Sequence, residues 1–327
     1  MKTLLTPAPA RPGTHTSGVL IIDKPSGWTS HDVVAKVRNL LKTRKVGHTG
    51  TLDPMGTGVL PICVGDATKL AGFAQMADKV YQVTMRLGVS TDTQDSTGEV
   101  TATHDLDPAL DWDRIVREQL AGMVGKISQI PPMYAAVKID GEALYKKARR
   151  GETVERPPRE ITVYGIDDIS VELPEVHFTL SCSKGTYVRT VASDVGDALG
   201  VGAHLTALSR TACGPLTLDE SITLDDLAEA VAEGRIEDVL KADDYLLGDR
   251  PILKVSEYTR ARMVQGISPH ISEWSMADGG RFDHTTFPEG TLCRVYGEKC
   301  GFFALAETGT DPGRPAKIRR IVKPNAA

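Results

Sequence analysis

One aspartate stands in the most unusual stretch of the chain. Asp53 belongs to the run KVGHTGTLDPMGTG, residues 45–58, which holds four glycines and one proline. Glycine costs about 1 kcal/mol and proline about 3 kcal/mol in a helix interior, so this stretch is predicted to be a loop. Pro54 biases the backbone of Asp53 towards extended conformations, so a stiff turn presents the carboxylate. An aspartate is ionised at neutral pH, which makes Asp53 a candidate nucleophile.

The simpler interpretation of Asp53 is a turn residue, because Asp-Pro commonly initiates turns. A longer sequence match favours a catalytic role for Asp53. The segments GHTGTLDP at 47–54 and GTGVLP at 56–61 resemble the signature loop of the TruB family, the tRNA pseudouridine synthases that act on the T-arm. The resemblance implies that Asp53 is the catalytic residue. Gly56 stands where the family more often has alanine, a change between small residues that leaves this expectation in place.

Two further segments resemble catalytic motifs of the family. In KGTYVRT, residues 184–190, the resemblance implies that Arg189 pairs with the catalytic aspartate and that Tyr187 lines the base pocket. A guanidinium beside Asp53 would keep the carboxylate ionised and orient it. In KVYQV, residues 79–83, the resemblance implies that Tyr81 stacks on the target uracil and offers its hydroxyl as a base near the C5 proton. Without the resemblance, Arg189 is typical of a surface residue and Tyr81 of a core residue.

Three more positions follow from the same resemblance. His48 is expected to fill or brace the gap left by a flipped base, Leu208 to form a wall of the pocket, and Lys24 in DKPSG to support the active-site loops. The residues alone leave each role open. They equally allow a neutral histidine satisfied within a turn, a core leucine and a lysine in a structural ion pair.

Short elements are predicted around these residues. Apolar or alternating residues predict strands within 18–27 and over 59–64, 79–87, 161–171 and 176–181. Thr29 or Ser30 is expected to cap a helix whose first turn holds Asp32. Further helices are predicted over 67–76, after Tyr187, and over 221–240, the last closing the first domain. The sequence therefore predicts a mixture of strands and helices around the Asp53 loop.

The segment from Lys126 to Arg159 is basic in an otherwise acidic chain. It has eight basic side chains against four acidic ones, with Tyr134 and Tyr145 among them. Basic residues interleaved with aromatic ones suit RNA, because charge supplies affinity and stacking adds about 1–3 kcal/mol per base. A solvated helical hairpin is the alternative. The resemblance implies an arm that grips an RNA stem-loop, and the residues expected to bind RNA are Lys146, Lys147, Arg149 and Arg150.

Composition limits the classes of protein to which this chain can belong. The chain has 327 residues and a formal net charge of −5 at pH 7, so any RNA-binding surface must be local. Residues 1–17 are rich in proline and are predicted to be a disordered tail. No apolar run approaches the roughly 20 residues of a membrane helix. Five cysteines without a C-x-x-C pair predict free thiols in a reducing cytosol.

No motif for a metal or a nucleotide cofactor is present. The histidines include no H-x-x-x-H pair, and both phosphate-binding glycine motifs are missing. The polar segment TDTQDSTG, residues 91–98, fails the EF-hand register and is expected to be a turn-rich loop, although the resemblance places it beside the active site. We therefore expect no cofactor and no metal, with chemistry that uses side chains alone.

Together these observations predict an α+β pseudouridine synthase fold. We expect a mixed, largely antiparallel sheet flanked by helices over 18–249, an RNA-gripping insertion over 126–159, and a small PUA-like β-barrel over 250–327. The implied function is isomerisation of uridine to pseudouridine at position 55 of the tRNA T-arm, by base flipping and an aspartate-dependent break of the glycosidic bond. The implied partner is the T stem-loop of tRNA, bound by a cytoplasmic monomer. The alternatives are a non-catalytic RNA chaperone and a synthase that acts on another RNA.

Overall fold

The computed structural model describes residues 16–74, 77–135, 137–139, 141–148, 150–248, 250–283, 287–311, 313–314 and 316–322. Most of the predicted disordered tail, residues 1–15, lies outside these ranges. Ser17 contradicts that prediction. It is 4% exposed, and its hydroxyl bonds the Asp243 side chain and the carbonyl of Val64. A buried and bonded hydroxyl makes Ser17 part of the fold.

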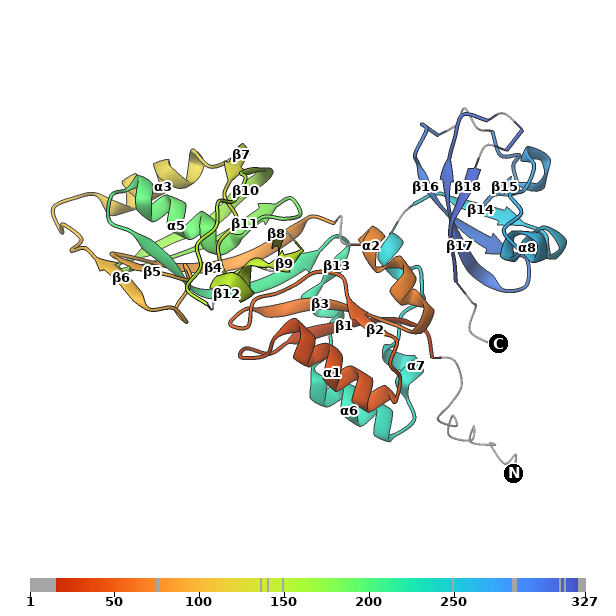
Figure 1. Ribbon diagram of the computed structural model, residues 1–327, viewed down its shortest axis with the longest axis horizontal. Helices are drawn as coiled ribbons and strands as arrows, with labels where there is room; N and C mark the ends of the chain where they lie inside the picture. Colours follow the sequence, from red (N-terminus) through yellow and green to blue (C-terminus); the bar gives the residue numbers. More distant parts are fainter. Residues whose placement is uncertain are drawn as a thin grey trace, which may run out of the picture.

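A nine-stranded sheet forms the framework of the first domain (Figure 1). Its main path runs β1-β3-β12-β4-β11-β10-β7, with β13 beside β12 and β2 beside β3. The strand pairs described for this sheet are antiparallel except β3 with β12, as the prediction of a mixed, largely antiparallel sheet requires. The strands are β1 Gly18–Lys24, β2 Val46–His48, β3 Thr57–Val64, β4 Lys79–Leu87, β7 Gly125–Gln129, β10 Arg159–Glu172, β11 Glu175–Cys182, β12 Ala203–Cys213 and β13 Leu216–Thr217.

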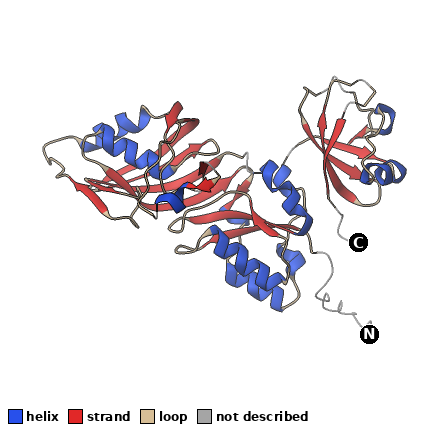
Figure 2. Cartoon of the chain, in the orientation of Figure 1, coloured by secondary structure: helices blue, strands red, loops and turns tan. Residues whose placement is uncertain are grey.

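The sheet has two halves that meet at a short parallel contact. Between β3 and β12 only Thr57 with Ser209 and Gly58 with Arg210 are in register. The half around β1 and β3 shares a core with α1 (Ser30–Leu41) and α6 (Leu224–Ala232). The half around β4 and β11 shares another core with α3 (Trp112–Ala121) and α5 (Val188–Ala198). Figure 2 shows helices lying beside each half of the sheet. The Asp53 loop leads directly into β3, so it lies where the two halves join.

The helix starts follow the capping rules, but two predicted helices differ in extent. Thr29 is the N-cap of α1 and forms a capping box with Asp32. The segment predicted as one helix over 67–76 is a 3₁₀ helix, η1 (Gly65–Leu70), followed by α2 (Ala71–Ala74). The helix predicted over 221–240 divides into α6 and α7 (Ile236–Val239), because Gly234 has a φ of 72° and breaks it.

β12 was not predicted from the sequence. Its pairing with β4 contains register shifts between Leu205 and Ala207 and between Arg210 and Ala212. Each bulge displaces the alternation of apolar and polar residues, which is the pattern that marks a strand in a sequence. The strand that joins the two halves therefore carries no regular signal.

The basic insertion contains little regular structure. Its described residues form β8 (Lys138–Ile139), β9 (Glu142–Ala143) and the short helix α4 (Leu144–Ala148). The alternative of a helical hairpin is therefore wrong. Before the insertion, β5 (Val89–Thr91) and β6 (Val100–Thr103) make a small hairpin around the polar loop.

The C-terminal domain is a five-stranded sheet in the order β15-β14-β16-β17-β18. In the described residues the outer strands β15 and β18 do not pair with each other, so the sheet is open where a closed barrel was expected. Its elements are β14 Ile252–Val255, α8 Glu257–Val264, η4 Ile271–Glu273, β15 Ser275–Met276, β16 Leu292–Gly297, β17 Gly301–Thr308 and β18 Ala316–Ile321. Two 3₁₀ helices, η2 Leu218–Glu220 and η3 Tyr245–Leu247, precede this domain in the chain. Among the described helices, none is both long and apolar enough to cross a membrane. All five cysteines are free.

Candidate active site

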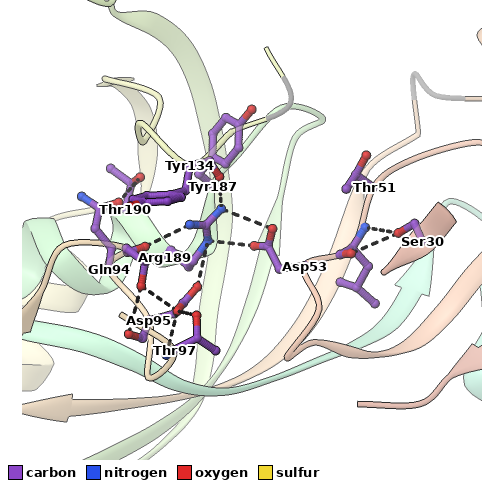
Figure 3. Close-up of polar contacts among 12 residues, drawn as sticks. Ser30, Thr51, Asp53, Gln94, Asp95, Thr97, Tyr134, Tyr187, Arg189 and Thr190 are labelled. Atoms are coloured by element: carbon purple, nitrogen blue, oxygen red, sulfur yellow. Dashed lines mark hydrogen bonds and ion pairs between the residues drawn. The ribbon is translucent and has the colours of Figure 1, made fainter. Parts of the chain in front are cut away.

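Asp53 and Arg189 form a two-point ion pair (Figure 3). Nε of Arg189 lies 2.8 Å from Oδ2 of Asp53, and Nη2 lies 3.2 Å from Oδ1. The Arg189 side chain is 3% exposed and that of Asp53 is 29% exposed. Arg189 is therefore not a surface residue. A buried guanidinium holds a carboxylate that still faces solvent, and the fold brings the two together from positions 136 residues apart.

The guanidinium of Arg189 is held by two further segments. Nη1 donates to the carbonyl of Thr93 at 2.9 Å, and Nη2 donates to that of Tyr134 at 2.9 Å. Oδ2 of Asp95 lies 3.6 Å from Nε. Asp95 is 5% exposed, and its Oδ1 accepts from the hydroxyl and the amide of Thr97. Sequence reasoning treated Asp95 only as part of a polar loop, yet it is a second buried anion beside Arg189.

The start of α5 is capped from another element. Tyr187 is the N-cap residue, and its own side chain makes no capping bond. Gln129, 2% exposed at the end of β7, accepts from the Tyr187 amide at 2.8 Å and donates to the Tyr187 carbonyl at 3.0 Å. Arg189 lies two residues further along, so this amide determines where the guanidinium sits. Nothing in the sequence marked Gln129 for that role.

The Asp53 loop is anchored to α1 by Ser30. The Ser30 hydroxyl accepts from the amide of Leu52 at 2.9 Å and donates to its carbonyl at 3.0 Å. Leu52 is 3% exposed and belongs to the core under β4. Both backbone groups of the residue before Asp53 are therefore fixed, and the loop has little freedom to move the carboxylate.

Lys24 holds the other side of the loop. It is 0% exposed, and its ammonium donates to three backbone carbonyls, those of Pro25 at 2.9 Å, Trp28 at 2.6 Å and Pro54 at 3.1 Å. Burial lowers the pKa of Lys24 to about 8, while the nearby carboxylate of Asp53 acts in the opposite direction. Lys24 thus ties the β1–α1 turn to the residue after Asp53.

The residues expected to line the base pocket differ in how far their side chains are exposed. Tyr81 and Leu208 are each 6% exposed and share one core cluster with Leu52. Burial raises the pKa of Tyr81 to about 12. Because the Tyr81 side chain is almost fully buried, its ring must become exposed before it can stack on a uracil. Tyr187 is half-buried, and burial raises the pKa of its phenol.

His48 lies at the end of β2, before the loop. Its Nδ1 is buried and has no hydrogen-bond partner in the described structure, and its ring lies edge-on to that of His31 with 5.3 Å between centroids. Burial, and then the charge of His31, lowers the pKa of His48. The ring also interacts with the backbone of Gly50 in the same loop, so the alternative of a neutral histidine within a turn stays open.

A groove of about 970 Å³ adjoins the loop. Its lining includes Pro54 and Met55, which follow Asp53 in the chain, together with Leu208 and the polar residues Gln82 and His177. The carboxylate at 29% exposure thus stands beside a space large enough for a nucleotide-sized group.

The four arm residues expected to bind RNA differ in their contacts. Lys146 is exposed and Lys147 half-buried, both on α4. Arg150 is engaged within the arm, because its guanidinium bonds Glu142 at 2.7 and 2.9 Å and Glu152 at 2.7 and 3.3 Å. Arg149 lies outside the described residues.

These groups suit chemistry carried out by side chains. Among the described residues there is no group of three or more His, Cys, Asp or Glu side chains able to hold a metal ion. A carboxylate that is oriented by a two-point arginine contact and still partly exposed can act as a nucleophile or stabilise a developing positive charge. Its geometry is set before any substrate binds, because Ser30, Lys24 and Arg189 all restrain it.

The fold places the chain among the pseudouridine synthases. A solved Cbf5-Nop10-Gar1 complex contains a chain that matches with a TM-score of 0.71 and 26% identity, over 94% of this chain and 85% of that one. The chain of an archaeal box H/ACA sRNP Nop10-Cbf5 complex matches in fold with a TM-score of 0.70. The expected pseudouridine synthase fold is therefore confirmed.

The sequence comparisons narrow the class to one family. Residues 38–188 match the N-terminal domain of TruB family pseudouridylate synthase, and residues 189–247 match the tRNA pseudouridylate synthase B C-terminal domain. Proteins named tRNA pseudouridine synthase B are 46% identical in Geobacter sulfurreducens, over 85% of this chain and 89% of the relative, and 41% identical in Cupriavidus metallidurans, over 97% and 98%. This chain belongs to the TruB family of pseudouridylate synthases.

Proposed function

We propose that this enzyme isomerises uridine to pseudouridine at position 55 in the T-arm of tRNA. The N1–C1′ bond breaks, the uracil turns, C5 bonds to C1′, the C5 proton leaves and N1 gains a proton. The observation that carries the proposal is the Asp53 carboxylate, 29% exposed beside a groove and gripped at both oxygens by Arg189. The relatives named tRNA pseudouridine synthase B support tRNA as the substrate.

Each side chain then has a role in the reaction. Asp53 acts as the nucleophile or stabilises charge on the sugar, through attack at C1′, addition to C6 or assistance of elimination at C2′. Arg189 orients it, and Tyr187 and Leu208 wall the pocket. Tyr81 stacks on the base, and its neutral phenol takes the C5 proton only as it gives up its own hydroxyl proton, so that it relays a proton. The base leaves its stack first, at a cost of a few kcal/mol, and His48 fills the gap.

The RNA is held by local positive surfaces. Lys146 and Lys147 contact the phosphates of the T stem-loop, and Arg149 and Arg150 belong to the same arm. The C-terminal domain acts as a PUA-like RNA-binding domain through Lys317, Arg319 and Arg320, of which Arg319 also pairs with Glu307 at 2.9 Å. Lys323, expected to join them, lies outside the described residues. The enzyme works as a cytoplasmic monomer.

Release of tritium from C5-labelled tRNA tests the role of Asp53. Asp53→Asn keeps the size of the side chain but removes the charge, so we expect release to fall at least about 1,000-fold while tRNA binding persists. Asp113→Asn, which changes an exposed carboxylate paired with Arg117, should leave the rate unchanged. Substantial release by the Asp53 variant would refute the proposal.

Incubation with T-arm RNA alone, followed by mapping of pseudouridine, separates the alternatives. A non-catalytic chaperone and a synthase with another substrate would both leave this RNA unmodified. A second incubation with total cellular RNA separates these two, because only the synthase would form pseudouridine there. The paired Asp53 and Arg189 argue against the chaperone, because RNA binding needs neither a buried guanidinium nor an exposed acid. Modification at position 55 alone supports the stated function.

The arm is tested by its two lysines. Replacing Lys146 and Lys147 together with alanine should raise KM for tRNA without lowering kcat, and should reduce the slope of log affinity against log salt by about 2. Arg150→Ala is the matched control, since Glu142 and Glu152 already neutralise its charge. An unchanged salt slope in the double variant would exclude phosphate contacts by these lysines.

A further inference from the structure

The largest fully buried side chain of the described structure is Arg210, on β12, which is 1% exposed. Its Nε donates to the carbonyl of Val59 at 2.7 Å. Nη1 and Nη2 reach the carbonyls of Thr51 and Gly50 at 3.4 and 3.5 Å. Two of these carbonyls precede Asp53 and the third follows it. One guanidinium therefore bridges the two ends of the loop that carries the acid.

The close approach of β3 to β12 makes this bridge possible. Gly58 is paired with Arg210 and has a φ of +96°, and a Cβ built there would lie 2.3 Å from the Arg210 carbonyl oxygen. Any other residue would separate the strands at this point. The absence of a side chain at Gly58 thus brings the end of the loop within reach of the guanidinium.

Arg210 also faces Tyr81. The two residues are directly opposite in the antiparallel pairing of β12 with β4, so their side chains lie on one face of the sheet. The positive charge of Arg210 opposes the rise that burial causes in the pKa of the Tyr81 phenol. Arg210 therefore joins the loop of the candidate nucleophile to the ring expected to stack on the base.

The charge of Arg210 is not needed for packing alone. Its hydrogen bonds run to backbone carbonyls, and its positive charge acts against the protonated forms of Lys24 and His48 nearby. A buried cation with cationic neighbours costs free energy that an apolar side chain of similar volume would not. The free-energy cost of burying this charge therefore indicates that Arg210 has a role other than packing.

We propose that Arg210 is a positioning residue of the isomerisation, which fixes the Asp53 loop relative to Tyr81 so that the carboxylate and the ring address the same nucleotide. The role rests on the proposed function of the site. Arg210 touches neither reacting atoms nor RNA, and acts through Gly50, Thr51, Val59 and Tyr81.

Two variants and two readouts test this role in the full chain. Arg210→Lys keeps the positive charge but loses the planar array of N–H donors, and Arg210→Met loses both. For Arg210→Lys we expect kcat on T-arm RNA to fall about 10- to 100-fold with KM little changed, and Arg210→Met to fall further. Amide hydrogen exchange over residues 50–59 should become faster in both variants. If Arg210→Met does not fold, the lysine variant carries both readouts.

The control is Val295→Ala, which opens a cavity in the core of the C-terminal sheet, a cluster that contains no residue of the Asp53 loop. It should lower the melting temperature while leaving kcat and the exchange of residues 50–59 unchanged. Arg210→Lys combined with Tyr81→Phe should lower kcat by less than the product of the single effects, because the two residues are directly opposite each other across β12 and β4.

The outcomes separate the positioning role from the proposed function. Unchanged exchange of the loop, or an unchanged kcat in an active Arg210→Met enzyme, would overturn the positioning role. Multiplicative effects with Tyr81→Phe would also count against it. If the wild-type enzyme leaves T-arm RNA unmodified, the proposed function is wrong. Faster exchange of the loop in the Arg210 variants would still support the contact between Arg210 and the loop.

Discussion

Arg189 has almost no capacity for further contacts, and this defines what it can do. Its donors go to both oxygens of Asp53 and to the carbonyls of Thr93 and Tyr134, with Asp95 3.6 Å away. A guanidinium saturated in this way is unavailable to an RNA phosphate. Its role at the residue scale is to hold one carboxylate at one angle, which an ammonium cannot reproduce because it lacks the planar fork.

Arg189→Lys should therefore lose rate and keep RNA affinity. We expect kcat for tritium release to fall about 100-fold, since a misaimed carboxylate meets the sugar poorly. Arg117→Lys is the matched control, because Arg117 makes a similar pair with Asp113 on the surface. Wild-type turnover by Arg189→Lys would show that the pairing is dispensable.

Lys24 gives the protein a specific dependence of stability on pH. Its pKa in the folded state is about 8, below its ordinary value of 10.5, so the unfolded chain binds the proton more tightly between these values. Stability must then rise as the pH rises through this window, by up to about 3 kcal/mol. Urea unfolding at pH 8 and pH 10 should show this rise in the wild type relative to Lys24→Met. The exposed Lys299→Met should follow the wild type, and a parallel course of Lys24→Met would contradict the assignment.

At the scale of elements, the site depends on how β7 meets α5. The helix has no side-chain cap of its own, and the amide of Gln129 supplies the contact from a strand 58 positions earlier. The same helix start carries Arg189, while β7 leads into the basic segment. One buried glutamine therefore links the basic segment to the pair of Asp53 and Arg189.

Gln129→Glu should disturb this connection with minimal change of shape. A carboxylate cannot donate to the Tyr187 carbonyl, which would be left unpaired in a buried place at a cost of about 1–3 kcal/mol. We expect a lower melting temperature and a reduced kcat together. Gln265→Glu, at the exposed C-terminal end of α8, is the control. Unaltered kcat in a destabilised Gln129 variant would confine the glutamine to a structural role.

At the scale of the whole molecule, the two domains are joined by a mixed contact. An apolar cluster combines Leu70 and Leu247 of the first domain with Phe302, Leu305 and Val322 of the second. Beside it, Asp244 accepts from Arg294 at 3.2 Å and from the Tyr296 hydroxyl at 2.5 Å. The C-terminal sheet is thus held in a defined place next to η1 and η3 rather than carried on a free linker.

Asp244→Ala should loosen the second domain. It leaves Arg294, whose side chain is 18% exposed, without its anionic partner, and breaking a buried pair costs about 3–5 kcal/mol before discounting for that exposure. Limited proteolysis should then cut near residues 248–250, while T-arm turnover by the first domain persists. Asp278→Ala, on an exposed turn, is the control. Uncut Asp244→Ala protein would show that the apolar cluster alone fixes the domain.

Local chemistry in the sequence determined much of this molecule. Glycine and proline spacing predicted a loop over residues 45–58, which the structure confines to 49–56 because β2 and β3 occupy its ends. Thr29 and Asp32 began α1, and alternation marked β4. The motifs around Asp53 and Arg189 also carried the family resemblance. These signals are local, because backbone preference and side-chain periodicity act over a few neighbouring residues.

Only the tertiary structure decided which distant groups meet. The bulged β12 hid its alternation, Gly234 divided a helix that the apolar pattern had joined, and Gln129 and Arg210 gave no signal at all. Each of these contacts joins residues far apart in the chain, and its geometry follows from how the two halves of the sheet pack. A sequence records the side chains that such contacts use, whereas burial and distance, which give them their strength, arise only when the halves come together.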